Sequence, residues 1–154
     1  MGDSRQIILD AIQALGLVLT ELTSASLYET DPLHVTDQGC FLNTVVCGLY
    51  QKSPEELLDQ IHLVEARFGR DRTKERRWGE RTLDIDILLF GDLVLSSKTL
   101  EIPHPRLHER RFALEPLLEL RPEICCPKTK IPYRETCDKL PPQGVRKLGI
   151  LNFR

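Results

Sequence analysis

One segment of eight residues constrains the fold of this chain most strongly. It runs from Leu83 to Phe90, reads LDIDILLF, and begins with strict alternation of apolar and acidic residues. Alternation with a period of two is typical of a β-strand with one buried face. The sequence therefore predicts a strand here, with Asp84 and Asp86 on the same face.

Two carboxylates on one strand face repel each other unless a cation lies between them. Mg2+ is the usual occupant, because it binds oxygen ligands and often takes one or two carboxylates together with substrate phosphates. Arg77 and Arg81 come just before Asp84 and Asp86. A guanidinium group can bind phosphate through two parallel hydrogen bonds. Metal, arginine and phosphate together indicate phosphoryl transfer.

The residues between 67 and 81 are strongly basic. The basic positions are Arg67, Arg70, Arg72, Lys74, Arg76, Arg77 and Arg81, opposed by Asp71, Glu75 and Glu80. Gly69, Gly79 and the lack of apolar periodicity predict a loop. Such a loop could close over a polyphosphate as a lid. The alternative is a solvated basic loop without a role, which is what a charge run usually means.

The composition bounds the remaining possibilities. A chain of 154 residues is long enough for one domain with a real core. The formal net charge of -2 argues against a general nucleic-acid binder, and no apolar run approaches the roughly 20 residues that span a bilayer. The five cysteines show no C-x-x-C spacing, which favours reduced thiols over structural zinc. We expect a single, monomeric, cytoplasmic domain without nucleic-acid or membrane partners.

Two helices have clear start signals. Asp3 and Gln6 precede an apolar stripe that predicts a helix from about Ser4 to Leu15. Ser53, Pro54 and Glu56 form a capping box with proline at the first helical position, and the second helix should end at Gly69. The other expected elements are strands at 22–28 and 41–49 around a loop at 29–39, a short strand ending at Leu95 and a helix over 112–120. The segment after Pro127 is rich in Pro, Lys and Arg and predicts no element.

The order helix, strand, strand, helix, strand predicts an α+β fold with helices packed on an antiparallel sheet. One further strand in front would complete the βαββαβ ferredoxin-like pattern. The first helix begins by about residue 4, so the sequence as given leaves no room for that strand.

Three sequence blocks resemble the hydroxymethyl-dihydropterin pyrophosphokinase family. The first, Arg77 to Gly91, matches R-W-G-x-R-T-L-D-x-D-I-L-x-x-G, and the second, Pro103 to Phe112, matches P-H-P-R-x-x-x-R-x-F. The third joins residues 28–33 with residues 41–43, and the resemblance extends from about Gly2 to about Pro127. It implies diphosphate transfer from ATP to the hydroxymethyl group of a dihydropterin, with release of AMP.

The resemblance also implies roles for individual residues. Asp84 and Asp86 would hold two Mg2+ ions. The catalytic arginines would be Arg70, Arg72 and Arg81, and the ATP-binding residues would be Glu65, Arg77, Trp78, His104 and Arg110. The pterin would be held by Thr30, Leu33, Phe41, Asn43 and Phe112, with the two phenylalanine rings stacked on its faces.

The sequence departs from the family in two places. The family opens with a strand that ends in Gly-Ser-Asn, whereas here Gly2-Asp3 follows Met1 directly. That strand is central in the family fold, so its neighbours would lose hydrogen-bond partners and expose an edge. In addition, residues 33–39 lack the glycine-rich stretch that is usual at this position.

Because of these departures, and because single residue types are not specific for one role, alternatives to the pyrophosphokinase interpretation stay open. The chain could be a truncated family member that is inactive or unstable. It could also be an RNA-binding module, because such modules share the βαββαβ order and use basic loops. Without the resemblance, Phe41 and Phe112 would be read as core residues, Asn43 as a strand-edge residue and His104 as a turn residue.

Overall fold

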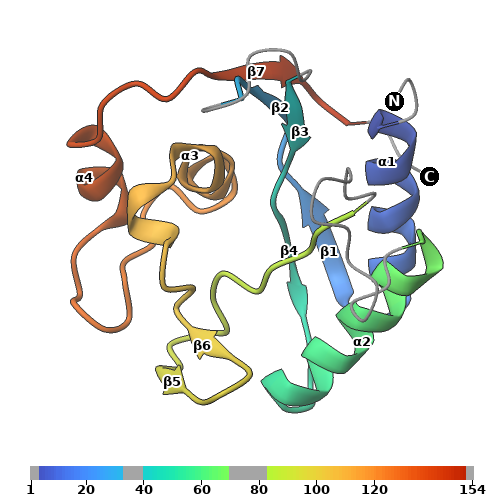
Figure 1. Ribbon diagram of the computed structural model, residues 1–154. Coiled ribbons are helices and arrows are strands. Elements are labelled where there is room, and N and C mark those ends of the chain that lie inside the picture. The colour runs from blue at the N-terminus through green and yellow to red at the C-terminus, as the bar shows by residue number, and fades with distance from the viewer. Residues whose placement is uncertain (1–3, 33–39, 70–82, 152–154) are drawn as a thin grey trace. The chain divides into compact units, whose positions relative to one another are not determined.

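The computed structural model describes residues 4–32, 40–69 and 83–151. The chain divides into two compact units. Unit 1 comprises Met1–Leu22, Gly48–Asp86 and Asn152–Arg154, and unit 2 comprises Thr23–Cys47 and Ile87–Leu151. Helices and small antiparallel sheets together confirm the α+β class (Figure 1).

Two helices that contact each other dominate unit 1. Helix α1 spans Ser4–Leu15 and α2 spans Pro54–Arg67, as the sequence predicted. Ser53 Oγ accepts a hydrogen bond from the Glu56 amide at 3.1 Å, and Glu56 Oε1 accepts from the Ser53 amide at 3.5 Å, which confirms the capping box. Asp3, the expected cap of α1, lies outside the described residues.

The two long strands predicted at 22–28 and 41–49 are each broken in the structure. The first becomes β1 (Thr20–Ser24) and β2 (Leu27–Thr30), and the second becomes β3 (Phe41–Asn43) and β4 (Val46–Leu49). The Thr44 hydroxyl shares its one proton between the carbonyl oxygens of Ala25 at 3.1 Å and Ser26 at 2.8 Å. At the break, a side chain thus bonds to carbonyl oxygens that a neighbouring strand would otherwise contact. On either side of it, β1 pairs with β4 and β2 pairs with β3.

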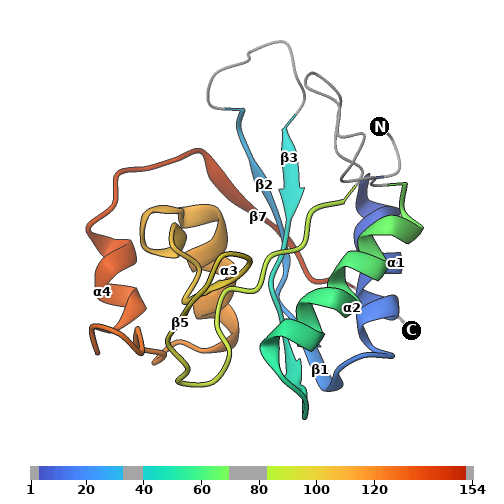
Figure 2. The same ribbon diagram turned by 60° about the horizontal axis from the view of Figure 1, so that its bottom comes forward.

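A three-stranded antiparallel sheet in the order β3-β2-β7 forms one layer of unit 2 (Figure 2). Strand β7 spans Val145–Gly149. In the β2–β3 register Tyr28 lies opposite Asn43 and Thr30 lies opposite Phe41. Opposite residues of an antiparallel pair point to the same face, as do alternate residues of one strand. These four side chains therefore share one face of the sheet.

Helical elements form the other layer of unit 2. Helix α3 spans Arg111–Leu120, α4 spans Tyr133–Asp138, and the short 3-10 helix η1 spans Leu107–Glu109. Strands β5 (Leu95–Ser96) and β6 (Glu101–Ile102) form a small hairpin. The buried core of the helical layer consists of Leu107, Ala113, Leu114, Leu117, Leu118, Tyr133 and Cys137. The sequence predicted α3 within one residue, but it predicted neither α4 nor β7.

The strand predicted at Leu83–Phe90 is wrong, because the structure assigns no strand to these residues. Its backbone groups bond elsewhere: the Ile85 amide donates to a Glu65 carboxylate oxygen, and the Leu88 carbonyl accepts from the His104 amide. These bonds take up groups that a strand would use in a ladder. Among the described residues, no helix combines the length and the apolar character needed to cross a bilayer.

Candidate functional site

One face of the β2–β3 pair carries two buried polar atoms without a partner. Thr30 Oγ1 and Asn43 Oδ1 are inaccessible to solvent and have no hydrogen-bond partner in the described part of the chain. Phe41, on the same face, is 54% exposed. Leaving a buried polar atom unpaired costs about 1–3 kcal/mol. Such atoms beside an exposed ring are therefore candidates for binding a ligand that supplies the missing hydrogen bonds.

Helix α3 covers this same face of the sheet. The Tyr28 hydroxyl donates to Glu119 Oε1 at 2.8 Å, and Tyr28 points to the face that bears Thr30 and Asn43. Phe112 precedes Glu119 by seven residues, which is close to two helical turns at about 3.6 residues per turn. Phe112 thus lies on the side of α3 that faces the sheet, toward the beginning of the helix.

Glu119 holds α3 against β2. Its Oε2 accepts hydrogen bonds from the Ser26 amide at 3.0 Å and the Ser26 hydroxyl at 2.9 Å. Burial acts to raise the pKa of Glu119, but the hydrogen bonds from Tyr28 and Ser26 lower it more, so the net pKa lies below its usual value. Burial, followed by the bond to Glu119, raises the pKa of Tyr28. The pair therefore consists of a carboxylate and a neutral phenol.

Sequence reasoning missed Glu119. The available signal was its spacing, because an acidic residue seven positions after Phe112 lies on the apolar side of an amphipathic helix. An acid in that place needs partners on the neighbouring element.

Arg110 and Phe112 lie in contact. The Arg110 guanidinium carbon is 5.4 Å from the centre of the Phe112 ring, within the range of a cation–π interaction. The resemblance to the pyrophosphokinases assigned these residues to different substrates, Arg110 to ATP and Phe112 to the pterin. The structure places both at the start of α3, so one local movement would affect both.

The predicted acid pair lies in the segment that leads out of unit 1. Asp84 and Asp86 are exposed, Leu83 and Ile85 are half-buried, and Ile87 is buried. Exposed acids therefore alternate with less exposed apolar residues, although the backbone forms no strand.

Glu65, on α2, is 1% exposed, and its Oε2 accepts from the Ile85 amide at 2.8 Å. This bond fixes the backbone between the two aspartates.

The acid pair suits a hard divalent cation. Within residues 4–32, 40–69 and 83–151, no group of three or more His, Cys, Asp or Glu residues could hold a metal ion. Mg2+ does not need such a group, because it commonly binds one or two carboxylates and completes its shell with water and substrate phosphates. The residues present thus fit Mg2+ better than zinc, which takes three or four protein ligands.

His104 lies in unit 2, just after a cis peptide bond between Ile102 and Pro103. Its Nδ1 accepts a hydrogen bond from the Arg106 amide at 3.1 Å. In the neutral ring the proton is then on Nε2. This tautomer can donate a hydrogen bond, as the expected role beside phosphate requires.

The remaining predicted site residues lie outside the described residues. They are Leu33, Arg70, Arg72, Arg77, Trp78 and Arg81. The structure thus places Thr30, Phe41 and Asn43 on one face of the sheet in unit 2 and Phe112 at the start of α3 in the same unit. It places Asp84 and Asp86 on either side of Ile85, whose amide Glu65 contacts in unit 1.

Comparison with known proteins identifies the family. The model of 7,8-dihydro-6-hydroxymethylpterin-pyrophosphokinase (HPPK) matches residues 1–122. The chain is 40% identical to the 2-amino-4-hydroxy-6-hydroxymethyldihydropteridine pyrophosphokinase of Aquifex aeolicus over 136 residues, which covers 88% of this chain and 83% of that protein. It is also 40% identical to the pyrophosphokinase of the same name from Haemophilus influenzae over 110 residues, 71% of this chain and 68% of that protein. The chain belongs to the HPPK family.

One fungal relative is much longer than this chain. The "Folic acid synthesis protein fol1" of Schizosaccharomyces pombe is 40% identical over 148 residues, which covers 95% of this chain but 20% of that protein. The chain therefore spans about a fifth of the length of this relative.

Proposed function

We propose that this chain transfers diphosphate from ATP to 6-hydroxymethyl-7,8-dihydropterin, with release of AMP, as a step of folate synthesis. The observation that carries the proposal is the β2–β3 face, where two unpartnered buried polar atoms lie beside an exposed aromatic ring. Membership of the HPPK family supports this activity over the RNA-binding alternative.

The β2–β3 face has the chemistry that a pterin requires. A pterin is flat, with hydrogen-bond donors and acceptors along one edge and two π faces. Asn43 and Thr30 would bind the edge, together with Leu33, and their unpaired atoms would gain partners on binding. Phe41 and Phe112 would stack on the two faces of the ring, the arrangement that aromatic groups prefer.

Basic residues would bind the triphosphate of ATP. Arg77, His104 and Arg110 would contact the phosphates, while Glu65 and Trp78 would line the nucleotide site. The catalytic residues would be Arg70, Arg72 and Arg81, whose guanidinium groups would stabilise the negative charge that develops during transfer. Glu65 would serve indirectly, because its carboxylate holds the backbone at Ile85.

Asp84 and Asp86 would hold two Mg2+ ions. When bound, the metal neutralises charge on the phosphates and orients them for displacement. The contribution of the chain is to keep both carboxylates on the exposed side of one segment while apolar neighbours are covered.

We further propose a ferredoxin-like arrangement for the sheet and helices, based on the order α1, β1–β2, β3–β4, α2. We also propose a cytoplasmic monomer that binds small molecules and not nucleic acid. The net charge of -2 and the free state of all five cysteines support these proposals.

The test is product analysis with and without the second substrate. The chain should form AMP from ATP in the presence of Mg2+ only when 6-hydroxymethyl-7,8-dihydropterin is added. Chromatography of the nucleotides measures AMP against ADP. Formation of ADP, or equal turnover without the pterin, would contradict the proposed function.

A further inference from the structure

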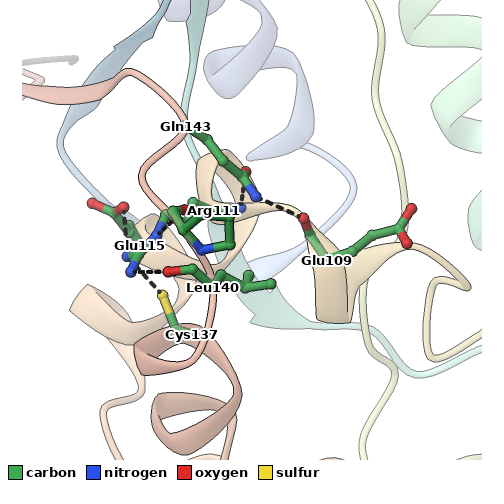
Figure 3. Close-up of polar contacts among 7 residues, drawn as sticks. Glu109, Arg111, Glu115, Cys137, Leu140 and Gln143 are labelled. Atoms are coloured by element: carbon green, nitrogen blue, oxygen red, sulfur yellow. Dashed lines mark hydrogen bonds and ion pairs between the residues drawn. The ribbon is translucent and has the colours of Figure 1, made fainter.

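Arg111, the first residue of α3, donates hydrogen bonds to the C-terminal part of unit 2 through both its backbone amide and its guanidinium group (Figure 3). We use the name Arg111 cluster for this residue and its partners. The members are Glu109, Arg111, Glu115, Cys137, Leu140, Pro141 and Gln143. None of them is among the residues to which a substrate role was assigned above.

The guanidinium group of Arg111 is satisfied on several sides. Nη2 donates to the Leu140 carbonyl at 2.9 Å, and Nε donates to the Pro141 carbonyl at 3.0 Å. Nη1 lies 3.3 Å from Glu115 Oε2 and 3.5 Å from Cys137 Sγ. A planar fork with five donors suits this arrangement, whereas an ammonium group would reach fewer of these acceptors at once.

The backbone of the first turn of α3 is held in the same way. The first amides of a helix have no acceptor within the helix, and Arg110 makes no capping bond with its side chain. Gln143 takes over this role: its Oε1 accepts from the Arg111 amide at 2.9 Å, and its Nε2 donates to the Glu109 carbonyl at 3.1 Å. One glutamine therefore joins the end of η1 to the start of α3.

The partners that hold this turn come from a separate part of the sequence. Leu140, Pro141 and Gln143 lie 29 to 32 residues after Arg111 and beyond residue 122, where the match to the HPPK family model ends. Arg110 and Phe112, the residues in cation–π contact, lie immediately before and after Arg111. The position of both thus depends on a segment outside the matched region.

We propose that Arg111 and Gln143 are positioning residues, which hold the first turn of α3 so that Arg110 meets the nucleotide and Phe112 meets the pterin. This proposal rests on the proposed function above. Neither Arg111 nor Gln143 is itself expected to touch a substrate. They affect the reaction only by fixing the positions of Arg110 and Phe112.

The test compares substitutions in the Arg111 cluster with an arginine at the other end of α3, the C-cap residue Arg121. In R111A and Q143A the Michaelis constants for ATP and for the pterin should both rise by about tenfold and kcat should fall, because misplacing a binding group by about 1 Å can cost up to about a hundredfold. Q143E keeps an acceptor for the Arg111 amide but loses the donor to the Glu109 carbonyl, so its Michaelis constants should lie between those of Q143A and the wild type. R121A is the control, because Arg121 is exposed and its Nη1 bonds only to the neighbouring Leu120 carbonyl among the contacts described; it should behave like the wild type.

The assays are run well below the melting temperature of each variant, with the folded fraction measured by circular dichroism. A purely structural role would lower the melting temperature and leave both Michaelis constants unchanged, which would overturn the positioning proposal but not the proposed function. A wild-type chain without AMP formation would overturn the proposed function instead. Fluorescence titration with 6-hydroxymethylpterin, comparing R111A with the wild type, then decides the positioning proposal, because equal affinities would overturn it.

Discussion

Two threonines of unit 2 show how differently the same side chain can be used. The Thr44 hydroxyl donates to two carbonyl oxygens at the break between strands, those of Ala25 and Ser26. The Thr30 hydroxyl is buried and has no partner among the described residues. Thr44 therefore stabilises the fold, whereas the Thr30 hydroxyl is costly unless a ligand contacts it.

Valine substitutions should separate these two roles. T30V removes an unpaired hydroxyl at nearly constant volume, so we expect the free energy of unfolding to rise by about 1 kcal/mol while the Michaelis constant for the pterin increases. T44V is the matched control and should lose about 1 kcal/mol. Urea unfolding and steady-state kinetics give both quantities. If T30V lost as much stability as T44V, the Thr30 hydroxyl would have a partner in solution and its proposed role would be wrong.

At the scale of the elements, one carboxylate of α3 accepts several hydrogen bonds from the neighbouring sheet layer. Glu119 accepts hydrogen bonds from Ser26 and Tyr28 of the sheet layer. The same helix carries Phe112 on the side that faces the sheet. The geometry of the expected pterin site is therefore coupled to the ionisation of Glu119.

This coupling predicts a pH-dependent stability. The pKa of Glu119 in the folded chain is below its ordinary value of 4.5, so its stabilising contribution is complete above that value and is lost as the pH falls through the folded pKa. E119Q should lower the free energy of unfolding by about 1–2 kcal/mol at pH 7, and the difference from the wild type should shrink below about pH 4.5.

Urea unfolding from pH 3 to pH 7 measures this difference. E123Q, a change at an exposed acid just after α3, is the control and should follow the wild type. A difference between E119Q and the wild type that stayed constant across this range would show that Glu119 does not titrate as expected.

At the scale of the whole molecule, the expected chemistry divides between the two units. Asp84 and Asp86 belong to unit 1, and the four described residues that are expected to bind the pterin belong to unit 2. Loss of a metal ligand should therefore affect turnover and leave the pterin site intact.

D86A tests this division. Turnover should fall by at least about a hundredfold, because electrostatic stabilisation at the phosphates is lost, while binding of 6-hydroxymethylpterin should change by less than about twofold. D92A, at the exposed turn after Phe90, should match the wild type in both measurements. Comparable losses of pterin affinity and turnover in D86A would assign the carboxylate a different role.

Much of the local structure followed from the sequence. The bounds of α1 and the capping box of α2 were both predicted. Asp84 and Asp86, predicted to share one face of a strand, are both exposed on a segment that forms no strand. The signals for these features lie within a few residues of each other, such as the pair Ser53 and Glu56. Aromatic and polar residue types, together with the resemblance, also indicated which residues belong to the candidate site.

Tertiary structure decided the rest, because the groups involved are far apart in the chain. At the breaks between β1 and β2 and between β3 and β4, Thr44 bonds back to Ala25 and Ser26, and no local pattern encodes that contact. Ser26 meets Glu119 across 93 residues. The periodicity of apolar residues in the sequence cannot predict a hydrogen bond between groups that are so far apart in the chain. Bonds of this kind hold the backbone of the segment 83–90 at Ile85 and Leu88, hold α3 on the sheet layer and join the start of α3 to the C-terminal part of unit 2.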